Sequence, residues 1–376
     1  MDHDVSRSEI GVDVRAPGRV NVIGEHTDYT GGFVLPCAIG YETCVTAHPR
    51  EGSVVVVRSR AGVGTFDLDH PRTGGTGDWQ DYVRGVLAEL RNAGVELKGA
   101  ELSVGGTLPM NAGLSSSASF EAAVALALLD IAGTTIERTR LALLLQRAEA
   151  GYAGTRCGIM DQFAVLHARA GSAIFLDTRS LAFEHVAIPA SLAIVICNSM
   201  VEHDLAADGS FNERRAACEE SVVRLRLRRP EVADLRDVTM TDLLRSRDLL
   251  PSPLFERCLH VVGENARVTE AVDALRAQDF SRLGALVRAS HESLRTNYAV
   301  SCPELDTLVR LAERLPGVYG ARMTGAGFGG CTVNLVERDH ADEFRARIAS
   351  AYERETGIVP AIYDGTPAGG ASVTRA

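Results

Sequence analysis

The first part of the chain alternates short apolar runs with turn residues and then changes to helical spacing. Between residues 12 and 66, β-branched runs such as VNVIG, ETCVTA and SVVVVRS are separated by Gly, Pro and Asp, which predicts strands. Apolar residues recur at helical spacing over residues 78–92 and predict a helix with one apolar face. A short strand is expected at 101–105. The helix expected at 115–132 is apolar almost all round, so we expect it to be buried.

The pattern changes in the second half of the chain. Helices are expected at 141–150 and from residue 158 onward, and the runs AIFLD and LAIVICNS are expected to be buried strands. Residues 213–313 are rich in Arg and Glu with helical periodicity broken at prolines, which predicts a helical region. A second glycine cluster, RMTGAGFGG, leads into an expected strand, CTVNLV. The small polar residues 364–376 are expected to be partly disordered.

The length of 376 residues exceeds one ordinary core, so two domains are expected, 1–185 and 186–376. A net charge of −10 argues against a nucleic-acid or anionic-membrane partner. The eight cysteines are scattered, which excludes paired-cysteine zinc and redox motifs and indicates reduced thiols. The start, MDHDVSRSEI, resembles neither a secretory nor a transit peptide, and no apolar run is long enough to span a membrane. We therefore expect a cytoplasmic monomer.

The stretch LPMNAGLSSSAS, residues 108–119, combines a turn with the start of the apolar helix. Backbone N–H groups at a helix N-terminus lack partners inside the helix and attract anions, so the stretch is a candidate phosphate-binding loop. The alternative is that its serines only cap a core helix. Lys98 is the only lysine, and it lies beside neither a Gly-Lys-Ser/Thr loop nor a protein-kinase strand motif. Both of those nucleotide-binding classes are therefore excluded.

Two further segments concentrate polar residues. The first, PGRVNVIGEHTDY at residues 17–29, places Arg, Glu, His and Asp within ten residues, a set suited to binding a polyol and a phosphate. The second is GIMDQF at residues 158–163, where Asp161 lies among apolar residues. Each polar residue alone has an ordinary structural explanation, and Asp161 could simply cap a helix.

Together these segments, with RMTGAGFGGCTV, resemble the galactokinase family of GHMP small-molecule kinases over essentially the whole chain. The resemblance implies an α/β (α+β) two-domain GHMP kinase fold, with mixed sheets and helices and the active site in the inter-domain cleft. It also implies transfer of the ATP γ-phosphoryl group to the C1 hydroxyl of galactose, giving galactose 1-phosphate. Phosphoryl transfer depends mainly on positioning and charge stabilisation, which suits these residues.

By position, Asp161 is similar to the family's catalytic base and Arg19 to the arginine that stabilises the transition state. The residues that the resemblance assigns to sugar binding are Glu25, His26, Thr27, Asp28, Gly158 and Phe211. Those assigned to ATP are Ser59, Trp79, Asn111, Ala112, Gly113, Leu114, Ser115, Ser116 and Ser117. Ser117 and Glu149 match the ligands of Mg²⁺, which accompanies ATP.

The chain departs from the family at three places. Met110-Asn111 replaces a step that usually contains Gly, and Asn tolerates the left-handed backbone that such a turn needs. Ala326 replaces a common glycine in the second glycine cluster. Where the family commonly has Ser-Glu-Tyr, the chain has Asp208-Gly209-Ser210-Phe211, without the phenol. Two alternatives stay open: a related 1-kinase for galacturonate or N-acetylgalactosamine, and a non-catalytic regulator that senses galactose and ATP.

Overall fold

The computed structural model describes residues 11–72, 74–201 and 209–375. Its first sheet carries the strands expected near the N-terminus: β1 (Val12–Asn21), β3 (Pro36–Pro49), β4 (Val54–Ser59), β5 (Gly62–Asp67), β6 (Ala100–Gly106) and, from the far end of the chain, β13 (Ser372–Arg375). The strand order is β13-β1-β3-β6-β4-β5. Only the β4–β6 pair within this sheet is parallel, so the sheet is mixed.

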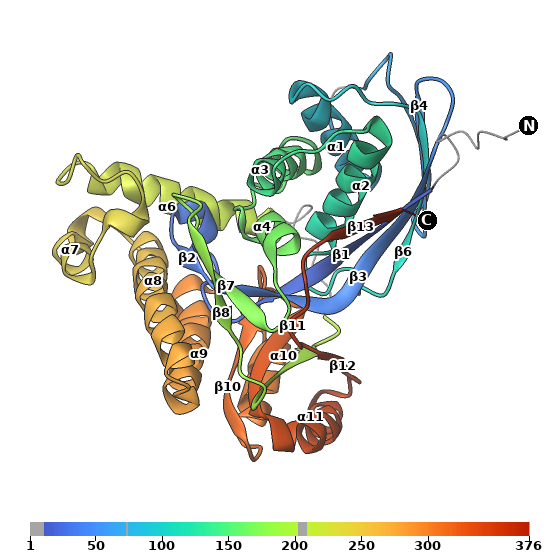
Figure 1. The fold of residues 1–376 in the computed structure, drawn as a ribbon. Coiled ribbons are helices and arrows are strands. Elements are labelled where there is room, and N and C mark those ends of the chain that lie inside the picture. Colours follow the sequence, from blue (N-terminus) through green and yellow to red (C-terminus); the bar gives the residue numbers. More distant parts are fainter. Residues whose placement is uncertain (1–10, 73, 202–208, 376) are drawn as a thin grey trace, which may run out of the picture.

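Four helices belong to this half: α1 (Gln80–Asn92), α2 (Ser116–Ala132), α3 (Arg138–Ala148) and α4 (Met160–His167). Helix α2 packs directly on β1 and β3, with α1 and α3 farther from the sheet (Figure 1). Most of its alanines and leucines are buried between the sheet and the other helices, as its apolar pattern predicts. The first turn of α2, which follows the glycine-serine loop, is thereby fixed against the sheet.

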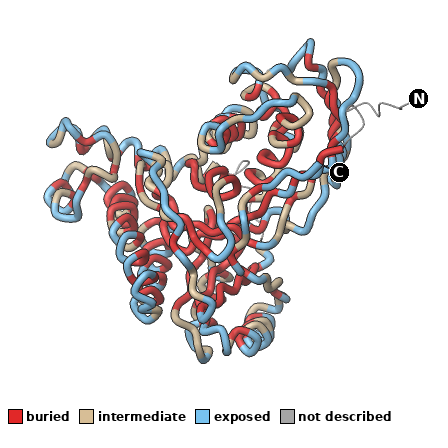
Figure 2. Tube along the Cα trace, in the orientation of Figure 1, coloured by how far each residue is buried: buried red, intermediate tan, exposed pale blue. Residues whose placement is uncertain are grey.

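The rest of the chain builds a second unit around a sheet of order β10-β11-β9-β12. Its strands are β9 (Leu192–Asn198), β10 (Val318–Thr324), β11 (Cys331–Glu337) and β12 (Ala361–Asp364). A smaller sheet joins β2 (Phe33–Val34), β7 (Ser172–Asp177) and β8 (Phe183–Ala187). The helices are α6 (Ser210–Leu225), α7 (Met240–Arg245), α8 (Leu254–Arg276), α9 (Phe280–Ser293), α10 (Pro303–Ala312) and α11 (Ala341–Thr356). Figure 2 shows buried residues running continuously from the first sheet into this second unit.

The helical region expected at 213–313 is confirmed by α6 to α10. The expectation of a partly disordered tail is wrong: residues 372–375 form β13, which pairs with β1 from Val12↔Arg375 to Arg15↔Ser372. Main-chain hydrogen bonds to an open sheet edge order this segment whatever its side chains. The domain boundary near residue 185 remains a prediction. Across the described part of the chain, no helix is long and apolar enough to cross a membrane.

Candidate active site

A cavity of about 1040 Å³ brings the three polar segments together. Residues from both halves of the chain line it, including Phe211 and Ala326 from the second half. The candidate residues on its wall are Arg19, Glu25, His26, Asp28, Ser59, Trp79, Asn111, Gly113, Ser115, Ser116, Ser117, Glu149, Gly158, Asp161 and Phe211. Thr27, Ala112 and Leu114 are not among the lining residues. The cavity is therefore the place where the sequence motifs meet.

The glycine-serine loop reaches the N-terminus of α2 through left-handed backbone. The φ angles of Asn111, Gly113 and Ser115 are 55°, 71° and 60°. Asn111 therefore adopts the left-handed backbone that we expected it to tolerate. Ser115 stands at the N-cap position of α2 but makes no side-chain cap bond, and its hydroxyl donates instead to Asp161 Oδ2 at 2.6 Å. The capping interpretation is therefore wrong for Ser115. The side chains of Ala112 and Leu114 point into the core and anchor the loop.

Arg19 and Asp161 form the central contact of the cavity. Arg19 Nε and Nη2 donate to the two oxygens of Asp161 at 2.7 and 2.8 Å, and Nη1 donates to the Gly113 carbonyl at 2.7 Å. A bulge in β1 between Pro17 and Arg19 turns the backbone toward the loop, where Arg19 N–H donates to the Leu114 carbonyl. The guanidinium is buried and bidentate, so it fixes the carboxylate against the glycine-serine loop.

The segment after β1 supplies His26 and Asp28. His26 Nε2 donates to the Ala326 carbonyl at 3.1 Å, so Nδ1 accepts from the Tyr29 hydroxyl at 2.8 Å. Burial lowers the pKa of His26 to about 3, which makes this imidazole neutral. Burial, together with the charge of Asp161, raises the pKa of Asp28 to about 7. In the cavity wall, His26 is buried and Asp28 is half-buried.

Gly158 lines the cavity beside Asp28, whereas Thr27 does not line it. A side chain at Gly158 would collide with the Asp28 carboxylate, so glycine is required for this approach. Thr27 is fully buried and its hydroxyl lies against the Gly24 and Phe33 carbonyls at 2.8 and 2.6 Å. It stabilises the turn rather than facing the cavity, which the sequence pattern does not distinguish.

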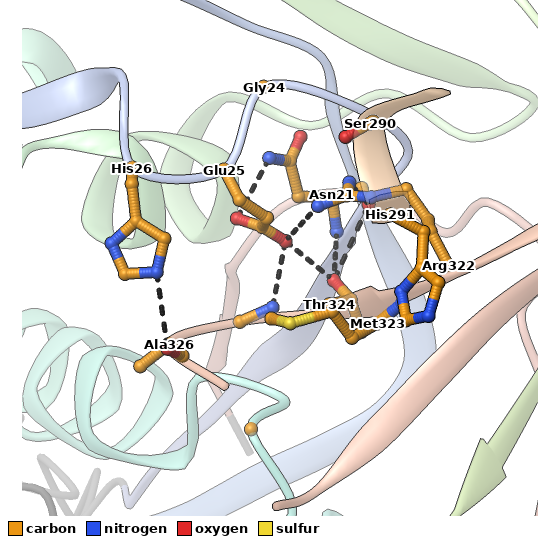
Figure 3. A network of polar contacts seen from close by, with 12 residues as sticks. Asn21, Gly24, Glu25, His26, Ser290, His291, Arg322, Met323, Thr324 and Ala326 are labelled. Atoms are coloured by element: carbon orange, nitrogen blue, oxygen red, sulfur yellow. Dashed lines mark hydrogen bonds and ion pairs between the residues drawn. The ribbon is translucent and has the colours of Figure 1, made fainter. Parts of the chain in front are cut away.

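Glu25 joins this segment to the second glycine cluster (Figure 3). Its Oε1 accepts from Gly325 N–H at 2.7 Å and from the Thr324 hydroxyl at 3.0 Å, and its Oε2 accepts from Asn21 Nδ2 at 3.1 Å. Arg322, fully buried, places Nη2 3.3 Å from Oε1. The carboxylate therefore holds β1 and β10 together at the edge of the cavity.

The predicted metal ligands lie next to one another. Glu149 follows α3 and is hydrogen-bonded to Ser117 and, at 2.7 Å, to Gln162 Nε2. Burial and the nearby Asp161 raise the pKa of Glu149 to about 7. Within residues 11–72, 74–201 and 209–375, no three His, Cys, Asp or Glu side chains gather as a complete metal site. A metal here would need oxygen ligands from elsewhere.

The remaining candidates occupy the two ends of the cavity. Ser59 and Trp79 line one end, where the Trp79 ring meets Phe120 edge to face at 6.4 Å. Phe211 lines the other end, with its ring 5.7 Å from His26 and 5.4 Å from Tyr29. Asp208, named with it above, lies outside the described residues, as do residues 1–10.

Sequence reasoning did not propose several residues that line the cavity: Tyr29, Phe120, Cys157 and Gly325. Tyr29 directly follows the EHTD run, and Gly325 belongs to the second glycine cluster, so both could have been found from their motifs. Phe120 belongs to the apolar pattern of α2, and nothing in that pattern distinguishes an apolar residue that lines the cavity from those in the core.

This fold, with a glycine-serine loop beside the paired Arg19 and Asp161, is that of a GHMP small-molecule kinase. Family models agree: GHMP kinases N terminal domain matches residues 81–169, GHMP kinases C terminal matches 271–354, and the galactokinase galactose-binding signature matches 6–49. A mevalonate kinase structure shares the fold, with a TM-score of 0.63 at 17% identity over 94% of this chain and 98% of that one.

Closer relatives narrow the assignment. The galactokinase of Roseiflexus sp. (strain RS-1) is 44% identical, covering 93% of this chain and 90% of the relative. That of Halalkalibacterium halodurans is 41% identical, covering 93% and 89%. The structure of Lactococcus lactis galactokinase complexed with galactose superposes with a TM-score of 0.92 at 37% identity, covering 96% of this chain and 95% of that one. The chain belongs to the galactokinase family.

Proposed function

We propose that this chain catalyses transfer of the γ-phosphoryl group of ATP to the C1 hydroxyl of galactose, releasing galactose 1-phosphate and ADP. The observation that carries the proposal is the Asp161 carboxylate, held in the cavity by Arg19 and by the phosphate-loop residue Ser115. A base fixed beside an anion-binding loop is what a transfer from phosphate to a hydroxyl requires. The family membership and the galactose-bound relative support galactose as the sugar.

The polarity of the cavity supports a proposal for how the two substrates bind. We infer that the phosphates bind at the N-terminus of α2, where backbone N–H groups and the Ser116 and Ser117 hydroxyls favour anions. The adenine would lie at the aromatic end beside Trp79. The sugar would lie at the opposite end, against Asp28 and the Gly158 backbone, with its C1 hydroxyl toward Asp161. This order places the acceptor hydroxyl between base and phosphate.

Asp161 would accept the proton of the C1 hydroxyl as the new O–P bond forms. Of its two oxygens, Oδ2 receives hydrogen bonds from Arg19 and Ser115, whereas Oδ1 receives one from Arg19. Oδ1 therefore retains a free lone pair, and we propose that this oxygen accepts the proton. Three of the five N–H bonds of Arg19 go to Asp161 and Gly113. The other two can face the charge that develops on the transferred group.

Magnesium fits the residues at the loop. Mg²⁺ prefers oxygen ligands and is commonly held by one or two carboxylates together with substrate phosphates. The neighbouring Ser117 hydroxyl and Glu149 carboxylate provide such a donor set, and the absence of a third acidic ligand among the described residues agrees with phosphate completing it. When bound, the ion would neutralise phosphate charge. Glu149, whose burial raises its pKa to about 7, is ionised more fully with the cation beside it.

The charge around the sugar end favours a neutral sugar over a uronate. Glu25, Asp28 and Asp161 line this end, and the two arginines that contact these acids, Arg19 and Arg322, are already paired with Asp161 and Glu25. A galacturonate carboxylate would face these acids with no free cation nearby among the described lining residues. A non-catalytic sensor would have no use for the Asp161 arrangement, so we expect turnover.

An ADP-release assay over galactose, galacturonate and N-acetylgalactosamine tests the function. We expect turnover with galactose, and a loss of about 10²–10⁴-fold in kcat for Asp161→Asn with ATP binding retained. Asp130→Asn is the matched control, because Asp130 also pairs with an arginine, Arg375, but outside the cavity. Faster turnover of galacturonate, or no ADP from any sugar, would overturn the substrate or the activity respectively. Near-normal activity of purified Asp161→Asn would refute the base.

A further inference from the structure

Helix α8 carries three buried polar side chains on the face that packs against the sugar-binding segment. His260, Glu264 and Asn265 are spaced i, i+4 and i+5, so they share one side of the helix. His260 and Glu264 are fully buried, and Asn265 is 9% exposed. None of the three lines the cavity. Buried polar groups require partners, so the question is what they bind.

All three bind the backbone of residues 24–33. Glu264 Oε1 accepts from the Gly24 N–H at 2.9 Å, and Asn265 Oδ1 accepts from the N–H of Phe33 at 2.9 Å. His260 Nε2 lies 3.0 Å from the Glu25 carbonyl, an acceptor only, so this ring nitrogen is the donor. The helix thus holds the segment at its first two residues and at its far end.

The segment needs this support because its backbone is unusual. Gly24 has φ of 106° and His26 has φ of 62°, a left-handed conformation that is uncommon for a residue with a side chain. Such conformations persist where the surrounding structure over-determines them. The turn that contains them is also the turn that points His26 and Asp28 into the cavity.

The helix face is itself fixed by neighbours behind it. Glu264 also accepts from the Ser290 hydroxyl at 2.6 Å and pairs with Arg267 Nε at 2.7 Å. Burial alone would raise the pKa of Glu264, but the charge of Arg267 lowers it to about 2, so the acceptor stays ionised. His260 Nδ1 accepts from the Ser293 hydroxyl at 3.1 Å, which sets the tautomer with the proton on Nε2.

We infer that His260, Glu264 and Asn265 are positioning residues for the acceptor sugar: they act through the backbone of residues 24–33 to place His26 and Asp28. This inference rests on the proposed function, since it assumes that the sugar lies against those two side chains. Losing one backbone contact would let the turn relax and would weaken sugar binding. The ATP end of the cavity, built on α1 and α2, would be unaffected.

Two substitutions of His260 test the inference directly. His260→Leu removes the donor to the Glu25 carbonyl, whereas His260→Gln can present an amide N–H near the position of Nε2. We expect His260→Leu to raise the galactose KM about tenfold while the ATP KM changes less than about twofold. His260→Gln should restore most of the galactose KM. Cys258→Ala, on the same helix and equally buried, controls for a loosened α8.

A second variant keeps the test decisive if His260→Leu does not fold. Asn265→Leu removes the contact to the Phe33 N–H at the other end of the segment and should also raise the galactose KM selectively. Unchanged galactose KM in a folded variant, or equal changes for both substrates and for Cys258→Ala, would overturn the inference. Absence of galactose turnover in the wild-type protein would instead overturn the proposed function, so the two failures are distinguishable.

Discussion

Gly158 lies where the backbone before α4 approaches Asp28, and the substitution Gly158→Ala tests that approach. Its φ does not lie in the left-handed region, so an alanine backbone is permitted there. The obstacle to the substitution is therefore steric. An added Cβ would lie 2.7 Å from Asp28 Oδ1, about 0.7 Å inside the 3.4 Å at which ordinary contact begins, and would overlap Oδ2 and Cγ. The carboxylate must therefore move.

The cost follows from what the moved carboxylate gives up. Asp28 Oδ2 accepts from the Met160 N–H at 3.4 Å, and the half-buried side chain packs in the cavity wall. Overpacking by one methyl group in such surroundings costs about 1–3 kcal/mol. Expressed on galactose kcat/KM, this corresponds to a loss of about 5- to 150-fold. In the proposed arrangement of the substrates Asp28 lies at the sugar end, so the ATP KM should change little.

The assay is steady-state ADP release with galactose and ATP varied in turn. Gly151→Ala serves as the control, because a Cβ at Gly151 meets nothing within 4 Å. The same substitution is then made in an Asp28→Ala background, where no carboxylate remains to collide with and the further loss should largely disappear. A folded Gly158→Ala protein with galactose kcat/KM within about twofold of wild type would refute the reasoning. So would an equal loss in the Asp28→Ala background.

Three further predictions concern the same wall of the cavity. Because the pKa of Asp28 is raised to about 7, its ionised, accepting form is lost as the pH falls through 7. The galactose KM should therefore rise between about pH 8 and about pH 6, and a profile unchanged in Asp28→Asn would contradict this. Glu25→Gln leaves the buried Arg322 without its counter-ion and should lower the free energy of unfolding by about 3–5 kcal/mol. In urea denaturation, the double variant Glu25→Gln/Arg322→Met should lose less free energy of unfolding than the sum of the two single variants. Losses that simply add would contradict the ion pair. Phe211→Tyr adds a phenol at the sugar end and should lower the galactose KM by a factor corresponding to about 0.5–1.5 kcal/mol, whereas a raised KM would show that the hydroxyl meets no sugar atom.

The elements that the sequence predicted are those whose pattern is local. The apolar helix α2, the strands before residue 67 and the helical region 213–313 follow from spacing and turn residues alone. The helix α11 and the short strands β8 and β12 were not predicted, since their patterns are too short or too polar to separate from loops. Strand β13 depends on a partner far away in the sequence, and its own residues carry no strong signal.

For the candidate site, too, the sequence predicted some features and not others. Motifs identified Arg19 and Asp161, and the folded chain adds the bidentate geometry of their contact across 142 positions. Thr27 lies within the same motif as His26, yet its hydroxyl faces the turn. The sequence could not predict this difference, because side-chain directions in an irregular loop follow no fixed periodicity. The supporting role of Glu264 was not foreseen, because an acid in a helical pattern normally indicates a solvent-exposed face.

Strand β13 also bears on the order in which the chain can fold during synthesis. The sheet that carries Arg19 begins with residues 12–21, yet one edge of β1 is covered by residues 372–375, which are synthesised long after them. Until then β1 presents unpaired backbone N–H and carbonyl groups along that edge. Nascent N-terminal domains commonly fold before synthesis is complete, so this one would do so with an edge open to pairing with another chain. Premature termination shortly before residue 372 would thus leave this edge of β1 open and the product prone to aggregate.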